Sequence, residues 1–483
     1  MSEAHPMNET PTLYWVRRDL RLADNPALLQ ASLRGPVIPV YVHAPDEEAP
    51  WQPGGASRWW LHQGLGALAA SLKETGSRLV IRRGPSAQAL QTLARETGAG
   101  AVFFNRLYEP ACSARDRSVT GSLQTLGLEV QSFQPGNLAE PQALANRQGQ
   151  PFKVFTHYWK ALQGRGEPAR ALAKPSRLQA PGKWPSSLAL AELELLPRAG
   201  PAGDWTAGLA EHWQVGEQAA AARLDAFSES ALEDYSRQRD YPGVEGASRL
   251  SAHLHFGEIS PRQVWQRLRL AESHHGNEAQ TLAFLRQLGW REFAQHVLHH
   301  YPKSPAEPMY PKYRAFPWRK DHAQLLDAWQ RGRTGIPVVD AGMRELWHTG
   351  FMHNRVRMLA ASLLVKNLRI PWWKGAAWFW DTLVDADLAN NTMGWQWSAG
   401  CGVDAAPYFR IFNPVLQGQK FDAGGRYLRR WLPELAALPD KLVQQPWLVS
   451  AENRHGYPLP IVDLAESRRE ALEALAATRH QDG

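Results

Sequence analysis

The first third of the chain alternates short β-like runs with amphipathic helical patterns. The strand candidates are Leu13–Arg17, Val37–Val42, Arg78–Arg82, Ala101–Asn105 and Leu128–Phe133. Helical patterns such as Arg58–Leu72 and Ser86–Glu96 lie between them. Strands that alternate with helices of this length indicate a parallel, doubly wound sheet, whose ligands lie beyond the carboxyl ends of the strands. No Gly-rich dinucleotide or triphosphate fingerprint follows any of these runs, so neither kind of ordinary nucleotide binding is indicated.

From about Glu217 the pattern changes to helical segments with short Gly and Pro breaks, which predicts an all-α domain. The residues between Gln134 and Gly216 are rich in Pro, Gly, Ala and Leu and show only short periodic segments. This composition is typical of a long connector that follows the surface. We therefore expect an α/β domain over residues 1–134, an interdomain connector over 135–216 and a helical domain over 217–483.

The composition narrows the class of protein. A formal charge of +7 permits a polyanionic partner but does not require one. The two cysteines, Cys112 and Cys401, exclude a disulfide framework and a Cys-based metal cage, and they favour a reducing compartment. The first residues have no signal-peptide pattern, and no run of about 18 apolar residues exists. We expect a cytoplasmic protein without a membrane span.

The stretch from Gly350 to Pro414 combines features that an ordinary Leu-rich core lacks. It holds six tryptophans and six Lys or Arg residues. It also places polar residues within apolar-looking sequence, namely Asn354, Asp385, Asp387, Asn390 and Asn391. A buried, unpaired charge is costly, so these side chains need partners. We infer that this stretch holds something large and flat that is polar at its edges.

Three short motifs each allow a structural and a functional interpretation. In the loop VRRDLRLADNPAL, we expect Asp24 or Asn25 to cap a helix that has Pro26 at its first position. The segment from Gly246 to Ser251 either cradles a phosphate through backbone N–H groups and Arg249 or is a plain capped loop. Asp385 and Asp387 are two residues apart, a spacing that suits a turn after a helix. They either take part in a binding site or serve as helix N-caps.

The segment LGWREFAQHVLHH predicts one helix with two notable sets of side chains. Gln287, Trp290 and Arg291 share one face of it. The set His296, His299 and His300 has metal-like spacing but lacks the internal Glu of a zinc-protease helix, and Glu292 can face solvent or pair with an arginine. We therefore expect solvated or helix-capping histidines and no metal.

Taken together, several long blocks in the same order resemble the DNA photolyase/cryptochrome family, from Trp15 to about Tyr457. The blocks are WVRRDLRLADN, VEGASRLSAHLHFGEISPRQ, LGWREF, GFMHNRVRMLAASLLVK, DTLVDADLANNTMGWQW and DAAPYFRIFNPVLQGQKFD. The resemblance implies an N-terminal α/β domain and a C-terminal helical domain that holds FAD in a folded conformation. Asn354 and Met358 stand where (6-4) photolyases place histidines, so the chain resembles the branch that repairs cyclobutane pyrimidine dimers.

The resemblance also implies an activity, that of a deoxyribodipyrimidine photolyase. Such an enzyme transfers an electron from excited reduced FAD to a dimer that is flipped out of UV-damaged DNA, single- or double-stranded. The dimer ring then splits and the electron returns, with no metal and no covalent nucleophile. We expect this protein to act as a monomer.

By motif match, the flavin would be surrounded by side chains from several of these blocks. They are Tyr235, Ser248, Arg249, Leu250, Ser251, Phe284, Arg291, Asn354, Arg357, Asp385, Asp387, Asn391 and Trp395. Arg249 would neutralise the pyrophosphate, and Arg357 beside Asp385 would form a charge-paired wall. Asn391 matches the position that faces flavin N5, where an amide cannot readily protonate a flavin anion. This favours the anionic reduced flavin that repair uses.

The resemblance assigns two further sets of residues. The photoreduction chain would run from the flavin to the surface through Trp395, Trp372 and Trp318, whereas Trp373, Trp378 and Trp380 are expected to be core or surface residues. Gln287, Trp290 and Asn354 would be catalytic. Damaged DNA would be bound by flat side chains that stack on the pyrimidines and arginines that hold phosphate, namely Arg239, Trp290, Arg355, Met358 and Trp397.

Two departures from the family pattern bear on the activity. Gln287 stands where the repair branch usually has Glu. Its amide can donate a hydrogen bond but cannot transfer a proton, so we expect retained but weaker repair. Ala111 and Cys112 stand where many folate-binding members have Asn and Glu, which leaves a folate or deazaflavin antenna open.

Two other functions compete with repair. One is a cryptochrome-type blue-light photoreceptor with weak or no repair activity, and the other is a flavin-binding DNA-interaction protein that repairs nothing. A photoreceptor would be expected to carry a C-terminal extension, whereas this chain stops soon after the resemblance ends near Tyr457, with AESRREALEALAATRHQDG as its last residues. We therefore favour the enzyme.

Overall fold

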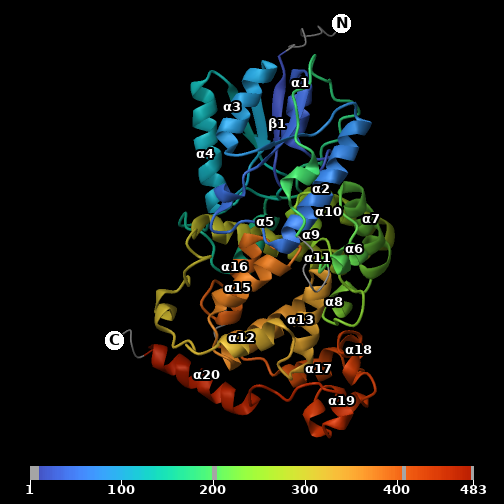
Figure 1. The fold of residues 1–483 in the computed structure, drawn as a ribbon, viewed down its shortest axis with the longest axis vertical. Helices are drawn as coiled ribbons and strands as arrows, with labels where there is room; N and C mark the ends of the chain where they lie inside the picture. The colour runs from blue at the N-terminus through green and yellow to red at the C-terminus, as the bar shows by residue number, and fades with distance from the viewer. Residues whose placement is uncertain (1–9, 198–203, 405–408, 480–483) are drawn as a thin grey trace.

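A computed structural model describes residues 10–197, 204–404 and 409–479 (Figure 1). Five strands form one parallel sheet in the order β3-β2-β1-β4-β5, with β1 Thr12–Val16, β2 Val37–His43, β3 Val80–Arg83, β4 Ala101–Asn105 and β5 Glu129–Phe133. The strand order reverses between β1 and β4, and a ligand cleft is expected at the carboxyl ends of these two strands. The predicted doubly wound sheet is confirmed, with strand limits moved by one or two residues.

Helices cover both faces of the sheet, as the alternation of side chains along each strand requires. The covering helices are α1 Pro26–Arg34, α2 Gly55–Glu74, α3 Ser86–Thr97 and α4 Pro110–Thr125. Successive strand residues point to opposite faces. Tyr14 and Val16 therefore share a core with α1 and α2, whereas Leu13 and Trp15 share one with α3 and α4.

The second half of the chain is helical, which confirms the predicted change of fold class. Its helices are α7 Glu217–Ala226, α8 Tyr235–Gln238, α9 Ser251–His255, α10 Pro261–His275, α11 Glu278–His300, α12 Ala323–Gln330, α13 Pro337–Thr349, α14 Asn354–Ser362, α15 Trp372–Thr382, α16 Leu388–Ala399, α17 Pro414–Phe421, α18 Arg426–Trp431, α19 Asp440–Val443 and α20 Leu464–Arg479. Figure 1 shows this half below the sheet, with α20 at the far end. Among the described residues, no helix combines the length and the apolar character that crossing a membrane requires.

The segment predicted as a surface connector does two different things. Its short helices are α5 Phe155–Gln163 and α6 Ala207–His212. Phe155, Tyr158 and Trp159 on α5 are buried in the core that α11 shares, so this part of the segment does not simply follow the surface. Farther along, backbone N–H groups of Leu178 and Leu188 donate to carbonyls of the α/β part, at Thr75 and Ile81. The segment thus holds both halves, and its exact limits as a connector stay a prediction.

The loop after β1 begins α1 as the sequence predicts. Asn25 is the N-cap, its Oδ1 accepts a hydrogen bond from the Leu28 N–H at 3.1 Å, and Pro26 occupies the first helical position. The Asn25 amide also donates to the Tyr14 hydroxyl, and the Asn105 amide donates to Asn25 Oδ1 at 2.8 Å. Asn25 therefore ties the start of α1 to the ends of β1 and β4.

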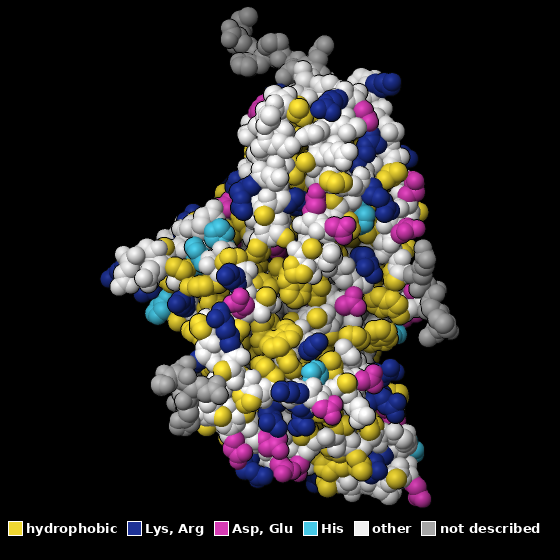
Figure 2. All heavy atoms as spheres, turned by 60° about the vertical axis from the view of Figure 1, so that its left-hand side comes forward, with side chains coloured by type: hydrophobic (Ala, Val, Ile, Leu, Met, Phe, Trp, Pro, Cys, Tyr) yellow, Lys and Arg dark blue, Asp and Glu magenta, His cyan; other side chains and the backbone are white. Residues whose placement is uncertain are grey.

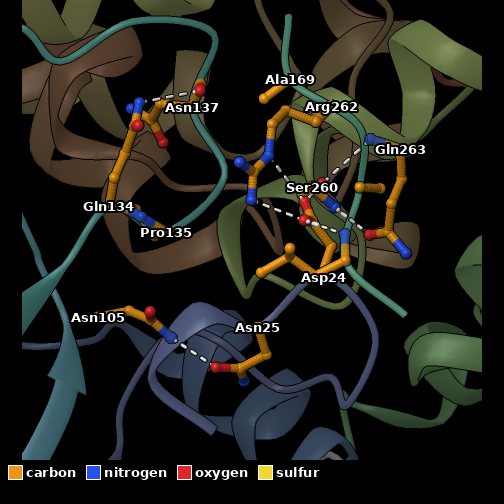
Figure 3. A network of polar contacts seen from close by, with 12 residues as sticks. Asp24, Asn25, Asn105, Gln134, Pro135, Asn137, Ala169, Ser260, Arg262 and Gln263 are labelled. Atoms are coloured by element: carbon orange, nitrogen blue, oxygen red, sulfur yellow. Dashed lines mark hydrogen bonds and ion pairs between the residues drawn. The ribbon is translucent and has the colours of Figure 1, made fainter. Parts of the chain in front are cut away.

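Asp24, one residue earlier, joins the two halves of the protein. It is fully buried, and its carboxylate accepts hydrogen bonds from Arg262 Nη2 at 2.6 Å and from the Ser260 hydroxyl at 2.5 Å (Figure 3). The Leu172 N–H donates to the same carboxylate at 2.9 Å. Arg262 and Ser260 belong to the start of α10, so one carboxylate contacts the α/β half, the connector and the helical half.

Neighbouring residues of this loop are held just as firmly. Arg21 is buried and donates to the carbonyls of Gly257 and Pro135. Gly257 has a φ of +65°, and a Cβ built there would lie 2.3 Å from the Arg18 carbonyl oxygen. Only glycine therefore allows the loop before α10 to approach this closely. We call Arg21, Asp24, Gly257, Ser260 and Arg262 the interdomain seam.

We predict that Asp24→Asn destabilises the protein strongly. Asn accepts the positive φ of +49° at this position but removes the charge that faces Arg262. Breaking a buried ion pair on one side costs about 3 kcal/mol or more. Urea denaturation followed by tryptophan fluorescence should show a lower midpoint. Asp321→Asn, which changes an exposed carboxylate, is the control, and equal midpoints for the two variants would contradict the seam.

Candidate functional site

An arginine–aspartate pair lies at the centre of the Gly350–Pro414 stretch. Arg357, on α14, donates through Nη2 to both carboxylate oxygens of Asp385, at 3.1 and 2.9 Å. Its Nε donates to the Met352 carbonyl at 2.7 Å, which fixes the plane of the guanidinium. The Arg357 and Arg249 guanidinium carbons each lie 5.3 Å from the centroid of the Phe351 ring. Two arginines therefore meet at this ring, and their acidic neighbours are Asp385 and the buried Glu345.

Asp387 caps α16 and at the same time carries a stabilised negative charge. Its carboxylate accepts hydrogen bonds from the backbone N–H and the side-chain amide of Asn390, at 2.8 and 2.7 Å. Burial alone would raise the pKa of this carboxyl, but His255, 3.6 Å away, and Arg291 hold that pKa well below its usual range. The N-cap alternative is thus correct for Asp387, whereas Asp385 pairs with Arg357.

Arg291 and Glu292 on α11 form a second buried charge group. Glu292 is only 2% exposed, and burial raises the pKa of its carboxyl to about 7 despite the opposing effect of Arg291. Arg291 Nη1 lies 3.4 Å from Glu292, and Arg291 Nη2 donates to the Leu254 carbonyl. Of the two expectations for Glu292, pairing with an arginine is the correct one.

The expectation of solvated or capping histidines is wrong for His296. Its ring is fully buried, Nδ1 lies 2.7 Å from the Pro141 carbonyl oxygen, and Nε2 accepts a hydrogen bond from the Phe152 N–H. Burial lowers the pKa of this imidazole to about 4. His299 alone of the three histidines is exposed. His296 therefore holds the connector against α11.

The residues predicted for the phosphate side include two buried aromatic rings and a polar loop. The rings of Tyr235 and Phe284 are buried, edge to face, with centroids 5.2 Å apart. The Ser248 hydroxyl accepts a hydrogen bond from the Leu250 N–H at 3.3 Å, and Arg249 has a positive φ of 52°. Ser251, the first residue of α9, is exposed. The turn is thus established, and binding of a phosphate by it stays a prediction.

The predicted lesion side gathers polar and flat side chains from four helices. Arg239 Nη2 donates to Gln287 Oε1 at 3.1 Å, and the Gln287 amide donates to the Ala283 carbonyl. Trp290, one turn along α11, stacks on Phe155 with ring centroids 3.6 Å apart. Asn354 is exposed, and its amide lies 3.8 Å from the Met358 sulfur.

Arg355 and Trp397 lie at the edge of this side. Arg355 pairs with Asp240 at 2.8 Å and lies 4.3 Å from the centroid of the Phe421 ring. Trp397 is partly exposed, whereas Trp395, two residues earlier on α16, is 2% exposed, because residues two apart point to different sides of a helix.

The predicted photoreduction residues Trp395, Trp372 and Trp318 all lie in the helical half, and the last two are joined through a fourth tryptophan. Trp395 packs edge to face against Phe379, with centroids 5.0 Å apart. Trp372 is 1% exposed, and its ring lies 5.9 Å from that of Trp373, which in turn lies 5.9 Å from that of Trp318. Trp373, expected only as a core or surface residue, therefore contacts two members of the predicted chain.

Comparison with known proteins identifies the family. The family model for DNA photolyase matches residues 12–176, and that for the FAD-binding domain of DNA photolyase matches residues 284–477. A deoxyribodipyrimidine photo-lyase from Agrobacterium fabrum is 44% identical over 98% of this chain and 99% of its own length. The chain belongs to the DNA photolyase family.

Photolyases and cryptochromes both occur among the relatives of this family member. Cryptochrome-1 from Arabidopsis thaliana is 38% identical over 96% of this chain and 70% of its own length. A solved bacterial class III photolyase from Agrobacterium tumefaciens superposes with a TM-score of 0.93 at 44% identity, and covers 99% of this chain and 100% of its own. The Synechocystis cryptochrome gives 0.87 at 32% identity, over 97% and 100%.

FAD is the cofactor of this photolyase-family chain. The matched FAD-binding domain includes Phe284, Arg357, Asp385 and Trp395 among the predicted flavin residues. The structure fits such a ligand, because the Arg249 guanidinium lies beside the Phe351 ring and its ion-pair partner, Glu245 at 3.8 Å, is exposed. When bound, the flavin pyrophosphate would give Arg249 an anionic partner.

Sequence reasoning missed three side chains of the site. Phe155 stacks on Trp290, His255 faces Asp387, and Trp373 touches Trp372 and Trp318. The doublet Trp372–Trp373 was a visible signal. Phe155 carried none, because it lies 135 residues before Trp290 in the segment expected to follow the surface.

Proposed function

We propose that this protein is a deoxyribodipyrimidine photo-lyase that uses light to split cyclobutane pyrimidine dimers in UV-damaged DNA. The Arg239–Gln287 contact beside the Trp290 ring supports this most directly, because it joins a cation, a hydrogen-bond donor and a flat surface at one place. The near-complete coverage of relatives named deoxyribodipyrimidine photo-lyase supports it as well. A flipped-out pair of pyrimidines needs the same three elements.

We assign the side chains as follows. Trp290, held flat by Phe155, and Trp397 stack on the pyrimidines, and Arg239 and Arg355 contact the phosphates. The Gln287 amide donates to a carbonyl of the dimer, with Asn354 and Met358 beside it. When bound, reduced FAD supplies the electron on excitation by blue light. Arg249 and Arg357 hold the anionic part of the cofactor, and Asn391, whose amide donates to the Ala376 carbonyl at 3.0 Å, withholds a proton from the ring.

We further propose that the protein acts as a monomer in the cytoplasm on single- or double-stranded damaged DNA. The two cysteines are buried and unpaired, which suits a reducing compartment. Figure 2 turns the molecule so that the left-hand side of Figure 1 faces the reader. On this face, hydrophobic side chains gather at mid-height, with Lys and Arg around them. Cations around an apolar centre suit a nucleic acid whose bases leave the stack.

The first prediction from this function is light-dependent repair. The protein loaded with FAD should remove cyclobutane dimers from UV-irradiated DNA under blue light and leave them intact in darkness. Protein that shows no flavin absorption at roughly 370–450 nm, even after reconstitution, would contradict the FAD site itself. A flavin-containing protein without light-dependent dimer loss would instead favour a cryptochrome-type photoreceptor. Gln287, which stands where the repair branch usually has Glu, is compatible with that function.

Gln287→Glu should raise the rate of dimer splitting. A protonated Glu donates a stronger hydrogen bond than an amide and can also transfer a proton, which we expect to be worth about 1 kcal/mol, roughly fivefold. Repair under limiting blue light measures this rate. Gln179→Glu, in an exposed loop, is the control for added charge. A rate that stays the same or falls in Gln287→Glu would show that Gln287 does not limit repair.

We propose that electrons reach the flavin through Trp318, Trp372 and Trp395, with Trp373 as an additional contact. In Trp372→Phe, photoreduction of oxidised FAD should slow by about tenfold or more, which corresponds to a barrier about 1.4 kcal/mol higher. Trp373→Phe should slow it less, since it removes one of the contacts to Trp318. Trp184→Phe, which changes a ring beside Arg78, is the control. Unchanged photoreduction in Trp372→Phe would exclude this route.

A further inference from the structure

Two helices far apart in sequence approach each other closely near the outer end of α13. Gly208 on α6 lies against His348 on α13, and a Cβ built on Gly208 would lie 2.2 Å from the His348 carbonyl oxygen. Trp213 Nε1 also donates to the Thr349 carbonyl at 2.7 Å. The contact therefore needs glycine at position 208, and it brings the last residues of α6 to the surface beside His348.

Three potential metal ligands converge at this contact. The side-chain ligand atoms of Glu211, His212 and His348 all lie within 4.8 Å of one another. The distance from His348 Nε2 to Glu211 Oε2 is 4.0 Å, and the two imidazole rings have centroids 5.3 Å apart. Within residues 10–197, 204–404 and 409–479, this is the group of His, Cys, Asp and Glu side chains with such an arrangement.

A hydrogen bond of the His212 ring leaves its other nitrogen available to bind a metal ion. His212 Nδ1 lies 2.8 Å from the Gly208 carbonyl oxygen, which can only accept a hydrogen bond. Nδ1 therefore carries the proton, and Nε2 keeps a free lone pair. Metal-binding histidines commonly donate their second ring N–H to a carbonyl in this way, which fixes the ring orientation. Gly208 thus both orients His212 and allows His348 to come near.

We propose that Glu211, His212 and His348 form a surface site for a divalent transition-metal ion such as Zn²⁺. Two imidazole nitrogens and one carboxylate suit Zn²⁺ and leave a fourth position for water. Bonds of about 2.0–2.1 Å place tetrahedral ligand atoms about 3.3 Å apart, so the separations here, 4.0 Å for one pair and at most 4.8 Å for the others, must shorten. His348 and Glu211 are 51% and 68% exposed, and their side chains have room to make this small rotation.

The bound ion would hold the end of the connector segment against the FAD-binding half. Trp205, just before α6, already stacks on Trp347 of α13, with ring centroids 5.6 Å apart. The metal would add a second link one turn or more along α6. None of its three ligands is among the residues assigned to flavin or DNA, so its loss should leave the absorption spectrum of bound FAD unchanged.

Isothermal titration of the chelator-treated, FAD-containing protein with ZnCl₂ tests the site. We expect one Zn²⁺ per chain, and an affinity that falls by about tenfold or more in each of His212→Ala and His348→Ala. His299→Ala is the matched control, because it removes an exposed histidine from the other histidine group, at the end of α11. Unchanged FAD spectra would show that the variants are folded.

Two results would overturn the proposal. One is the absence of Zn²⁺ uptake by the unaltered protein. The other is uptake that His299→Ala weakens while His212→Ala and His348→Ala leave it intact, which would place the ion on α11. A rise in thermal unfolding temperature with Zn²⁺ that disappears in His348→Ala would support the proposed link between α6 and α13.

Discussion

The buried carboxylate of Asp24 is the contact on which the arrangement of the two halves depends. It lies in the loop after β1, and its partners come from α10 and from the connector. A charge without solvent is stable only while its partners stay in place, so the halves cannot separate without exposing or unpairing it. The seam therefore holds the carboxyl ends of β1 and β4 against the helical half, which contains the FAD-binding domain. Trp60 of α2 adds a second such contact, because it donates to the buried Glu258 at 2.9 Å.

Behind this seam, the cofactor site is an arrangement of fixed charges more than an apolar pocket. Asp385 is held in position by Arg357, and Asp387 by Asn390 and His255, before any ligand binds. Arg249 is held less firmly, since its ion-pair partner Glu245 is 3.8 Å away and exposed. A preorganised site of this kind loses little entropy when the ligand binds. Side chains on the predicted lesion side are also held in position before a ligand binds, because Trp290 stacks on Phe155 and Gln287 accepts a hydrogen bond from Arg239.

Gln287 is the point at which the family resemblance and the chemistry of this chain differ. Position 287 lies one turn before Trp290 on α11, so any residue at position 287 is a neighbour of that ring. The Gln287 amide can support a dimer carbonyl but cannot protonate it. Arg239 donates to the Gln287 side chain, so a permanent cation lies beside the position where the repair branch usually has Glu. We therefore expect Gln287 to set how efficiently this chain repairs dimers.

Local signals were sufficient for much of the fold. The alternation of strands and helices, the Asn25 cap with Pro26 and the face shared by Gln287 and Trp290 follow from neighbours a few residues apart, which is the range over which capping and periodicity act. The motif blocks also indicated which half holds FAD. Only the tertiary structure decided that His296 is buried against the connector, that Trp373 touches Trp318, and that His212 meets His348. These contacts join residues 55 to 155 positions apart in the sequence, and no local pattern records which segments will pack together.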